Sequence, residues 1–367
     1  MRGIEGARGR WTGRVLRGLG VVGALLLLVL SLVKGDWPSE PSYGNGWPVP
    51  LSVKASILRS LLALVAGLAL AWMPSLAPWR ERAGRWLFHS PRRRIQWVLG
   101  TAAFLLYAGV AWFRFKGLPF LDDDAAALFQ ARIFAAGRLT LPVPKYGQFF
   151  SLFGLLGRAH EHPFVCTMYP PGLSLLLLPG VLAGVPWLMI PVTGGLLVAA
   201  TITLGAELAG ERVGRLAGLF MLGSPFIGIL SGTHLSHIPT AGLLVVCWLA
   251  VVRLLRTGRI RHGVMAGAAW GAACLFRPLT ALVVGVVVAL GVLVQWRRAL
   301  AAWRGVLAAL LLAVAGGALL AAWQQATVGD ALMPGHVIGM RRNGRMGFVR
   351  FTDTRAHTPA IAWDHTL

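Results

Sequence analysis

Residues 238–255 have the sequence IPTAGLLVVCWLAVVRLL, and the basic sequence RTGRIR follows directly at residues 256–261. A helix of about 20 apolar residues is long enough to cross the hydrocarbon core of a bilayer, which is about 30 Å thick. Because arginine and lysine gather at the cytoplasmic ends of membrane spans, this stretch predicts a transmembrane helix whose C-terminal end is cytoplasmic.

The composition extends this prediction to the whole chain. Of the 367 residues, 56% are hydrophobic and 13% are charged, and the mean hydropathy is +0.67, which is too apolar for a water-soluble protein of this length. The apolar runs predict an all-α polytopic membrane bundle of about nine transmembrane helices. Their expected positions are residues 15–33, 58–78, 95–115, 187–208, 216–231, 238–255, 264–276, 279–294 and 306–323.

The net charge of +22 comes from 35 lysine and arginine residues against 13 aspartate and glutamate residues. These basic residues form short clusters between the apolar runs, as the positive-inside rule requires, rather than one basic face that would bind nucleic acid. The sequence also lacks a P-loop and a soluble stretch large enough for a nucleotide-binding domain. We therefore expect the lipid bilayer as a partner and no nucleic acid.

The basic clusters also predict the topology. Five arginines, four before the first apolar run and Arg17 near its start, place the N-terminus in the cytoplasm, and the arginines of residues 80–94 mark the next cytoplasmic loop. The long loop at residues 116–168 is then external, on the periplasmic side of an inner cell membrane. This topology divides the chain into an N-terminal helix pair at residues 1–94, a membrane core at 95–323 and the start of an external loop at 324–367.

One apolar segment, residues 173–185, must not span the membrane if this topology is right. It has only about 13 apolar residues between Pro170-Pro171-Gly172 and Pro186, and such short segments are more often re-entrant or interfacial. If it did span, the basic clusters at residues 253–261 and 297–304 would be external, against the positive-inside rule. We therefore predict a re-entrant or juxtamembrane segment here, and interfacial helices in the external loop.

Gly263, Gly267 and Gly271 lie four residues apart in the seventh apolar run. Small residues at this spacing form one helix face on which another helix can pack closely. This run of glycines therefore predicts helix packing and no binding site.

Asp122-Asp123-Asp124 is the densest group of carboxylates and precedes the helix-forming residues 125–136. One of the three could cap a helix N-terminus and favour its dipole. Capping needs a single carboxylate, however, and three adjacent acids repel one another. We therefore expect at least one of them to act in a functional site on the external face.

Three other polar groups are predicted to reach the same face. Arg277, followed by Pro278, separates two apolar halves, where it could either snorkel to the interface or hold a phosphate with its planar fork. His234 and His237 are expected in a loop, where hydrogen bonding in an external cavity is favoured over metal binding, which would need further ligands. Tyr169 precedes the short segment at residues 173–185.

Three motifs, LDDDAAALFQA at residues 121–131, FAAGRL at residues 134–139 and MYPPG at residues 168–172, together with Arg277, resemble the polytopic glycosyltransferases of the GT-C class. Within that class the chain is similar to the protein O-mannosyltransferases and aminoarabinose transferases, over residues 95–323. Two departures stand out: Asp123-Asp124 replaces an Asp-Glu pair, and Ala127 occupies a position that is tyrosine in the family pattern. The family continues through further helices, so the resemblance also implies that the chain is truncated at its C-terminus.

The resemblance implies transfer of a sugar from a polyprenyl-phosphate donor to an acceptor hydroxyl on a glycan, lipid or protein. Asp123 would be the general base, with Asp124 supporting it or orienting the acceptor. Arg277, Tyr169 and His237 would bind the phosphate or the pyranose, and a single displacement would invert the anomeric carbon. No cofactor is required, although the aspartates would suit a divalent cation. The alternatives are a non-catalytic transporter or scaffold and an inactive glycosyltransferase paralogue.

Overall fold

The computed structural model describes residues 77–143, 155–156 and 164–336, in two compact units that divide between Ser90 and Pro91. In the first unit, α3 (Ala77–His89) is a basic helix with an exposed ion pair between Glu81 and Arg85. The predicted spans at residues 15–33 and 58–78 lie outside the described residues, apart from the last two residues of the second.

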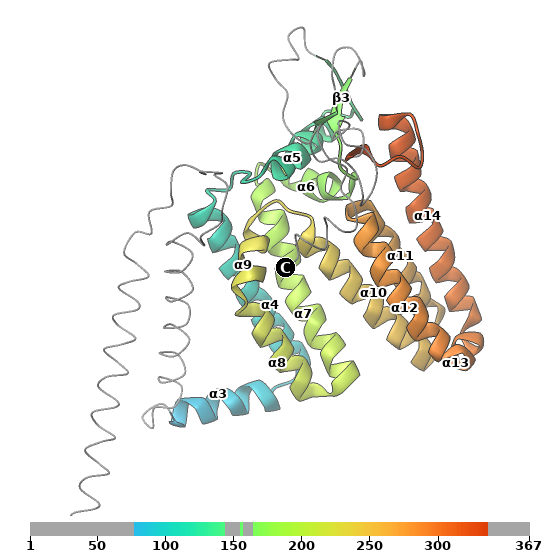
Figure 1. Cartoon of the computed structure of the whole chain (residues 1–367). Helices are drawn as coiled ribbons and strands as arrows, with labels where there is room; N and C mark the ends of the chain where they lie inside the picture. The colour runs from blue at the N-terminus through green and yellow to red at the C-terminus, as the bar shows by residue number, and fades with distance from the viewer. Residues whose placement is uncertain (1–76, 144–154, 157–163, 337–367) are drawn as a thin grey trace, which may run out of the picture. The chain divides into compact units, whose positions relative to one another are not determined.

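The second unit is mostly helical (Figure 1), which agrees with an all-α membrane bundle. Within its described residues, four helical stretches are long and apolar enough to cross a membrane, at residues 92–114, 186–209, 237–257 and 303–328, and a bent pair at 211–232 would be a fifth. The predicted count of about nine is therefore not established.

The helices of the second unit that the structure describes are α4 (Arg92–Gly109), η2 (Val110–Arg114), α5 (Asp122–Ala135), α6 (Gly172–Leu182), η4 (Pro186–Leu188), α7 (Met189–Ala209), α8 (Glu211–Leu222), α9 (Pro225–Gly232), α10 (His237–Thr257), α11 (Ile260–Phe276), α12 (Pro278–Val294), α13 (Trp296–Ala301) and α14 (Trp303–Val328).

The single helix predicted at residues 216–231 is wrong, because the chain bends by 58° between α8 and α9. Pro225 has no N–H, so it cannot bond to the carbonyl of Met221 in the preceding turn. The N–H of Ser224 and the hydroxyl of Tyr107 on α4 donate to that carbonyl instead, at 3.2 and 3.1 Å. Ser224 caps α9 by accepting from the N–H of Ile227. The carbonyl of Met221 is therefore still hydrogen-bonded at the bend.

The segment predicted not to span the membrane forms α6, a helix of 11 residues. At about 1.5 Å per residue this helix is too short to cross a bilayer. The two short halves around Arg277 are also separate helices, α11 and α12, with Arg277 between them. Both local predictions agree with the structure, whereas the placement of α6 relative to the bilayer stays a prediction.

The glycine run of α11 packs closely against another helix, as predicted, and that helix is α14. A Cβ atom on Gly263 would lie 1.9 Å from the carbonyl oxygen of Gly305, and one on Gly267 would lie 2.3 Å from that of Ala309. One turn further, a Cβ on Gly271 would lie 2.8 Å from the carbonyl of Leu312. No side chain fits at these three positions, so the two helix backbones are in direct contact.

The loop before α6 contains a small sheet that the all-α prediction missed. Its order is β1-β3-β2, with β1 (Leu141–Pro142) and β2 (Leu155–Leu156) both antiparallel to β3 (Phe164–Thr167). Gln130 on α5 ties the sheet to that helix, because its amide donates to the carbonyl of Leu139 at 2.8 Å and accepts from the N–H of Thr167 at 2.9 Å. This connection fixes the position of the residues that follow β3.

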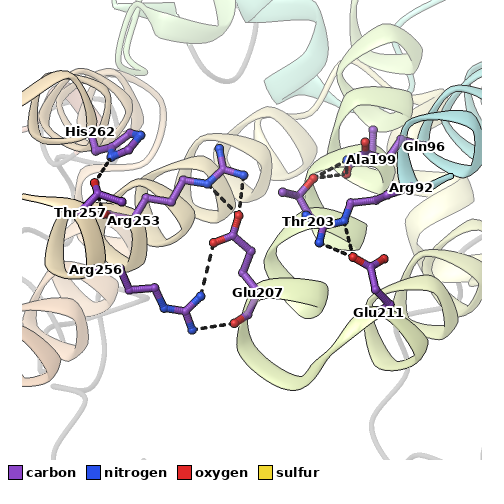
Figure 2. A network of polar contacts seen from close by, with 10 residues as sticks. All are labelled: Arg92, Gln96, Ala199, Thr203, Glu207, Glu211, Arg253, Arg256, Thr257 and His262. Carbon is purple, nitrogen blue, oxygen red and sulfur yellow. Dashed lines mark hydrogen bonds and ion pairs between the residues drawn. The ribbon is translucent and has the colours of Figure 1, made fainter. Parts of the chain in front are cut away.

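Ion pairs tie the helices together at the end where α7 and α10 finish (Figure 2). Glu207 on α7 accepts from Arg253 at 2.6 and 2.8 Å and lies 3.5 Å from Arg256, both on α10. Glu211 at the start of α8 pairs with Arg92 at the start of α4. Four helices are thereby linked at one end, opposite the end where α10 begins.

Candidate functional site

A cavity of about 300 Å³ lies at the end of the bundle where α11 and α14 finish. Residues that are distant in the sequence meet here: Asp123 from the start of α5, Tyr169 from the loop after β3, and Arg277 from the junction of α11 and α12. The other lining residues are Ala127, Met168, Pro170, Leu173, Leu235, Ser236, Phe276, Pro278, Leu279, Thr280, Leu320, Trp323, Gln324, Thr327, Pro334, Gly335 and His336.

The three aspartates form the first turn of α5 and face three different environments. The cap position is Leu121, whose side chain cannot bond to the helix, so a capping aspartate is not what the structure contains. Successive helical residues point about 100° apart. As a result Asp122 is exposed, Asp123 is half-buried and lines the cavity, and Asp124 is fully buried. Of the three, only Asp123 faces the cavity.

The hydroxyl of Tyr169 donates a hydrogen bond to Oδ1 of Asp123. Burial and the neighbouring carboxylate of Asp123 raise the pKa of Tyr169 well above its usual value. The phenol therefore keeps its proton and remains a donor at neutral pH. The bond fixes one oxygen of Asp123, so the carboxylate is held in place to accept a proton on its other oxygen.

Arg277 and His237 form a second pair in this region. The Nη1 group of Arg277 donates to Nε2 of His237 over 3.1 Å, and Nε of Arg277 lies 3.4 Å from the hydroxyl oxygen of Thr280. A ring nitrogen that accepts from a guanidinium must be unprotonated. His237 was predicted in a loop but is the first residue of α10, whereas His234 lies in the connection between α9 and α10. The remaining N–H groups of Arg277 are suited to an anion in the cavity.

Asp124 and His234 are buried behind the site. Asp124 is the third helical residue and accepts from the N–H of Phe120 at 3.2 Å, one residue before the cap residue Leu121, whose N–H a capping box would use. Burial raises the pKa of Asp124 to about 6, although backbone N–H groups of Phe120, His234 and Leu121 oppose this shift. Because Asp124 does not line the cavity, its predicted support of Asp123 would be indirect, and it is not placed to orient an acceptor.

His234 is 2% exposed, and burial lowers its pKa to about 4. Neither of its ring nitrogens has a hydrogen-bond partner among the described residues. It is also absent from the cavity lining, so the predicted hydrogen bonding of His234 in an external cavity is wrong. The imidazole is neutral and enclosed by the elements that meet at the start of α10.

Five polar residues of the cavity lining were not predicted as site residues: Ser236, Thr280, Gln324, Thr327 and His336. Gln324 could have been predicted from the sequence, because the pair Gln324-Gln325 follows the last apolar run and amide side chains are unfavourable inside a membrane span. His336 had no such signal. It reaches the cavity because the chain returns after α14, where a Cβ on Gly335 would lie 2.5 Å from the carbonyl of Met168.

A metal centre is not assembled by the residues that the structure describes. Among residues 77–143, 155–156 and 164–336, no group of three or more histidine, cysteine, aspartate or glutamate side chains is arranged to hold a metal ion. A divalent cation at Asp123 would therefore take most of its ligands from elsewhere.

A second, apolar cavity of about 470 Å³ adjoins the first. It lies between α6, α7, α10 and α11 and is lined chiefly by apolar side chains such as Leu176, Leu196 and Leu243. Phe276 lines both cavities. A polar cavity with a carboxylate and a guanidinium thus adjoins an apolar one suited to a hydrocarbon chain.

Neither a family model, nor a curated protein, nor a solved structure matches the chain.

Proposed function

We propose that the chain is a membrane glycosyltransferase that moves a sugar from a polyprenyl-phosphate donor to an acceptor hydroxyl on the non-cytoplasmic side of the membrane. The observation that carries this proposal is that Asp123 and Arg277, which lie in distant segments of the sequence, line the same cavity. A glycosyl transfer of this kind needs a base for the acceptor proton and a cation for the departing phosphate. The cavity contains one residue of each kind.

In the proposed reaction, the acceptor oxygen forms a bond to the anomeric carbon while the bond from that carbon to the phosphate oxygen breaks. Asp123 takes the proton of the acceptor hydroxyl. Arg277 stabilises the negative charge on the polyprenyl phosphate that leaves. One displacement on the face opposite the leaving group inverts the anomeric carbon, and no covalent enzyme intermediate is needed.

Tyr169 and His237 act as supporting residues in this proposal. Tyr169 fixes the orientation of the base through its hydrogen bond to Asp123. His237 holds the guanidinium of Arg277 from one side, so that its other donors are presented to the phosphate. Because Tyr169 and His237 already hold the base and the cation in place, these two groups lose less conformational entropy when the substrates bind.

The neighbouring apolar cavity supports a donor with a hydrocarbon tail. Its wall at Phe276 is shared with the polar cavity, so a lipid phosphate at Arg277 would have its prenyl chain beside an apolar surface. A water-soluble nucleotide sugar would leave that surface empty.

Ala127 occupies a position that is tyrosine in the family pattern, and this difference is relevant to the alternative that the chain is an inactive paralogue. Ala127 lines the cavity, and its small side chain leaves space that a tyrosine would fill. Tyr169 brings an aromatic hydroxyl to Asp123 from the loop after β3. An aromatic donor at the base is therefore retained in this chain, although from another position.

The proposal is tested with the chain in proteoliposomes, supplied with a polyprenyl-phosphate donor carrying a radiolabelled sugar and with a crude envelope extract as acceptor. We expect label to enter the acceptor fraction covalently while free polyprenyl phosphate accumulates. Label that crosses the membrane without forming a new covalent bond would instead identify a transporter. No movement of label in either form, with folded protein, would contradict both functions.

A further inference from the structure

The arginines of the C-terminal half of the described chain are concentrated at the end opposite the candidate site. Residues 216–329 contain eight arginines and no lysine, aspartate or glutamate. Arg277 alone lies at the site. The other seven lie in or beside the α10–α11 and α12–α14 connections at the far ends of the helices: Arg253, Arg256, Arg259, Arg261, Arg297, Arg298 and Arg304.

These two connections lie side by side. A Cβ on Gly305, in the first turn of α14, would lie 2.3 Å from Cδ1 of Leu254 and 3.6 Å from Cα of Ile260. The α10–α11 connection is therefore in contact with the start of α14, and α13 also contacts α10. Figure 1 shows α13 at the ends of α12 and α14. Arginines from both connections thus contribute to one surface.

Five of these arginines have no acidic partner among the described residues. Glu207 is engaged by Arg253 and Arg256 (Figure 2). The remaining five are all exposed, and none of them forms an ion pair with a carboxylate in the part of the chain that the structure describes. We call them the basic surface: Arg259, Arg261, Arg297, Arg298 and Arg304.

Apolar side chains stand among these charges. Trp296 and Trp303 are 55% and 56% exposed, and Leu300 between them is 62% exposed. Arg297 lies 5.4 Å from the ring centre of Trp296, and Arg304 lies 5.5 Å from that of Trp303. Tryptophan beside arginine is typical of the headgroup region of a bilayer, where an apolar ring and a cation are both favourably placed.

We propose that the basic surface binds the phosphate groups of anionic phospholipids, with Trp296, Leu300 and Trp303 inserted among the adjoining acyl chains. Charge favours this partner, because five guanidinium groups that pair with no carboxylate among the described residues complement a leaflet of negative headgroups. The exposed aromatic and leucine side chains favour a lipid over a nucleic acid, which would leave them in water. The adjoining helices α10 and α14 are long and apolar enough to be spans, so their ends would lie at headgroup depth.

Lipid binding is measured by native mass spectrometry of the full chain in a neutral detergent, with phosphatidylglycerol or phosphatidylcholine added. The test variant carries Arg297→Gln, Arg298→Gln and Arg304→Gln. The control carries Arg93→Gln, Arg94→Gln and Arg212→Gln, which removes three exposed arginines elsewhere. We expect phosphatidylglycerol to bind more tightly than phosphatidylcholine, and the test variant to lose about tenfold or more of that affinity, against about twofold for the control.

Three results would overturn the proposal: equal binding of the two lipids, equal losses in both variants, or displacement of phosphatidylglycerol by inorganic phosphate at equal concentration. The last result would indicate a site for free anions. A further variant with lysine at the same three positions keeps the charge and should retain most of the binding. Circular dichroism in neutral detergent verifies that each variant is folded, so a loss of affinity is not a loss of structure.

Discussion

Asp122, Asp123 and Asp124 have the same carboxyl group and differ in what surrounds it. Water surrounds the first, Tyr169 bonds to the second, and the third is enclosed beside Phe120. The sequence indicated that at least one of the three was functional and favoured Asp123 only through a family resemblance. The three residues differ because α5 begins at Asp122, so that each aspartate points in a different direction from the helix axis. The sequence of three adjacent acids did not show at which residue the helix would begin.

The buried pair behind the site predicts opposite pH dependences in two variants. An unfolded aspartate has a pKa near 3.9 and an unfolded histidine near 6.5. The raised pKa of Asp124, about 6, contributes stability that is fully present below about pH 4 and lost as the pH rises to 6. The lowered pKa of His234, about 4, contributes stability that is present above pH 6.5 and lost as the pH falls to 4. The two slopes oppose each other.

We therefore expect the thermal midpoint of Asp124→Asn in detergent to fall between pH 6.5 and 4, because His234 is left unopposed. The midpoint of His234→Gln should rise over the same range. Each slope is at most about 1.4 kcal/mol per pH unit. Asp122→Asn is the control and should follow the unaltered chain. Parallel curves for all four proteins would show that neither buried group titrates as described.

Replacing Arg277 by alanine should weaken the binding of the donor more than the rate of the chemical step. Loss of a charged hydrogen bond of about 1.5–3 kcal/mol raises the KM for the lipid-linked sugar about 10–100-fold. Lysine at this position keeps the charge but not the planar fork and should give an intermediate loss. Arg132→Gln, on the exposed side of α5, is the control. An effect confined to the KM of the acceptor would contradict the role of Arg277.

At the scale of helices and strands, the sequence predicted the long apolar helices but missed the bend at Pro225 and the short strands. The spans at residues 238–255 and 306–323 are close to α10 and α14, because about 20 apolar residues leave little ambiguity. The bend before Pro225 was readable from Gly223-Ser224-Pro225 but was not inferred. Strands β1 to β3 have two to four residues each and depend on partners elsewhere in the chain, so their own sequences do not identify them.

The contact between α11 and α14 predicts a strong effect of one methyl group. Gly263→Ala would place a Cβ 1.9 Å from a backbone oxygen of α14, so the helices must separate. We expect a loss of stability of about 1–3 kcal/mol, measured as a lower thermal midpoint in detergent. Gly317→Ala is the control, since no atom lies within 4 Å of its Cβ position, and it should be neutral or slightly stabilising. Equal midpoints for the two variants would contradict the close packing.

At the scale of the whole molecule, the distribution of charge predicted which residues would share one end of the bundle, although Asp124 and His234, placed there too, do not line the cavity. Because the basic loops alternate with other loops along the chain, Asp123, Tyr169, His237 and Arg277 were predicted at one end of the bundle. In the structure Asp123, Tyr169 and Arg277 line one cavity, and His237 is in contact with Arg277. His336 could not be predicted in this way, because its position depends on the return of the chain over Met168.

The orientation in the membrane gives a prediction for the intact chain. The native cysteines at residues 166, 247 and 274 are buried, so the unaltered chain should react little with a membrane-impermeant maleimide. In sealed vesicles of known orientation, Asp122→Cys should react only from the external side and Arg261→Cys only from the cytoplasmic side. Labelling of both variants from the same side would contradict the predicted topology.

The most direct test of the proposed chemistry is the transfer rate of Asp123→Asn beside that of Asp122→Asn, both in proteoliposomes with a lipid-linked sugar donor. Asparagine has nearly the same shape as aspartate but cannot accept the acceptor proton. Since a general base contributes about 10²–10⁴-fold to a rate, Asp123→Asn should transfer sugar at least about 100-fold more slowly, while Asp122→Asn stays within about twofold of the unaltered chain. Transfer by Asp123→Asn at the unaltered rate, or an equal loss in both variants, would contradict the assignment of Asp123 as the base.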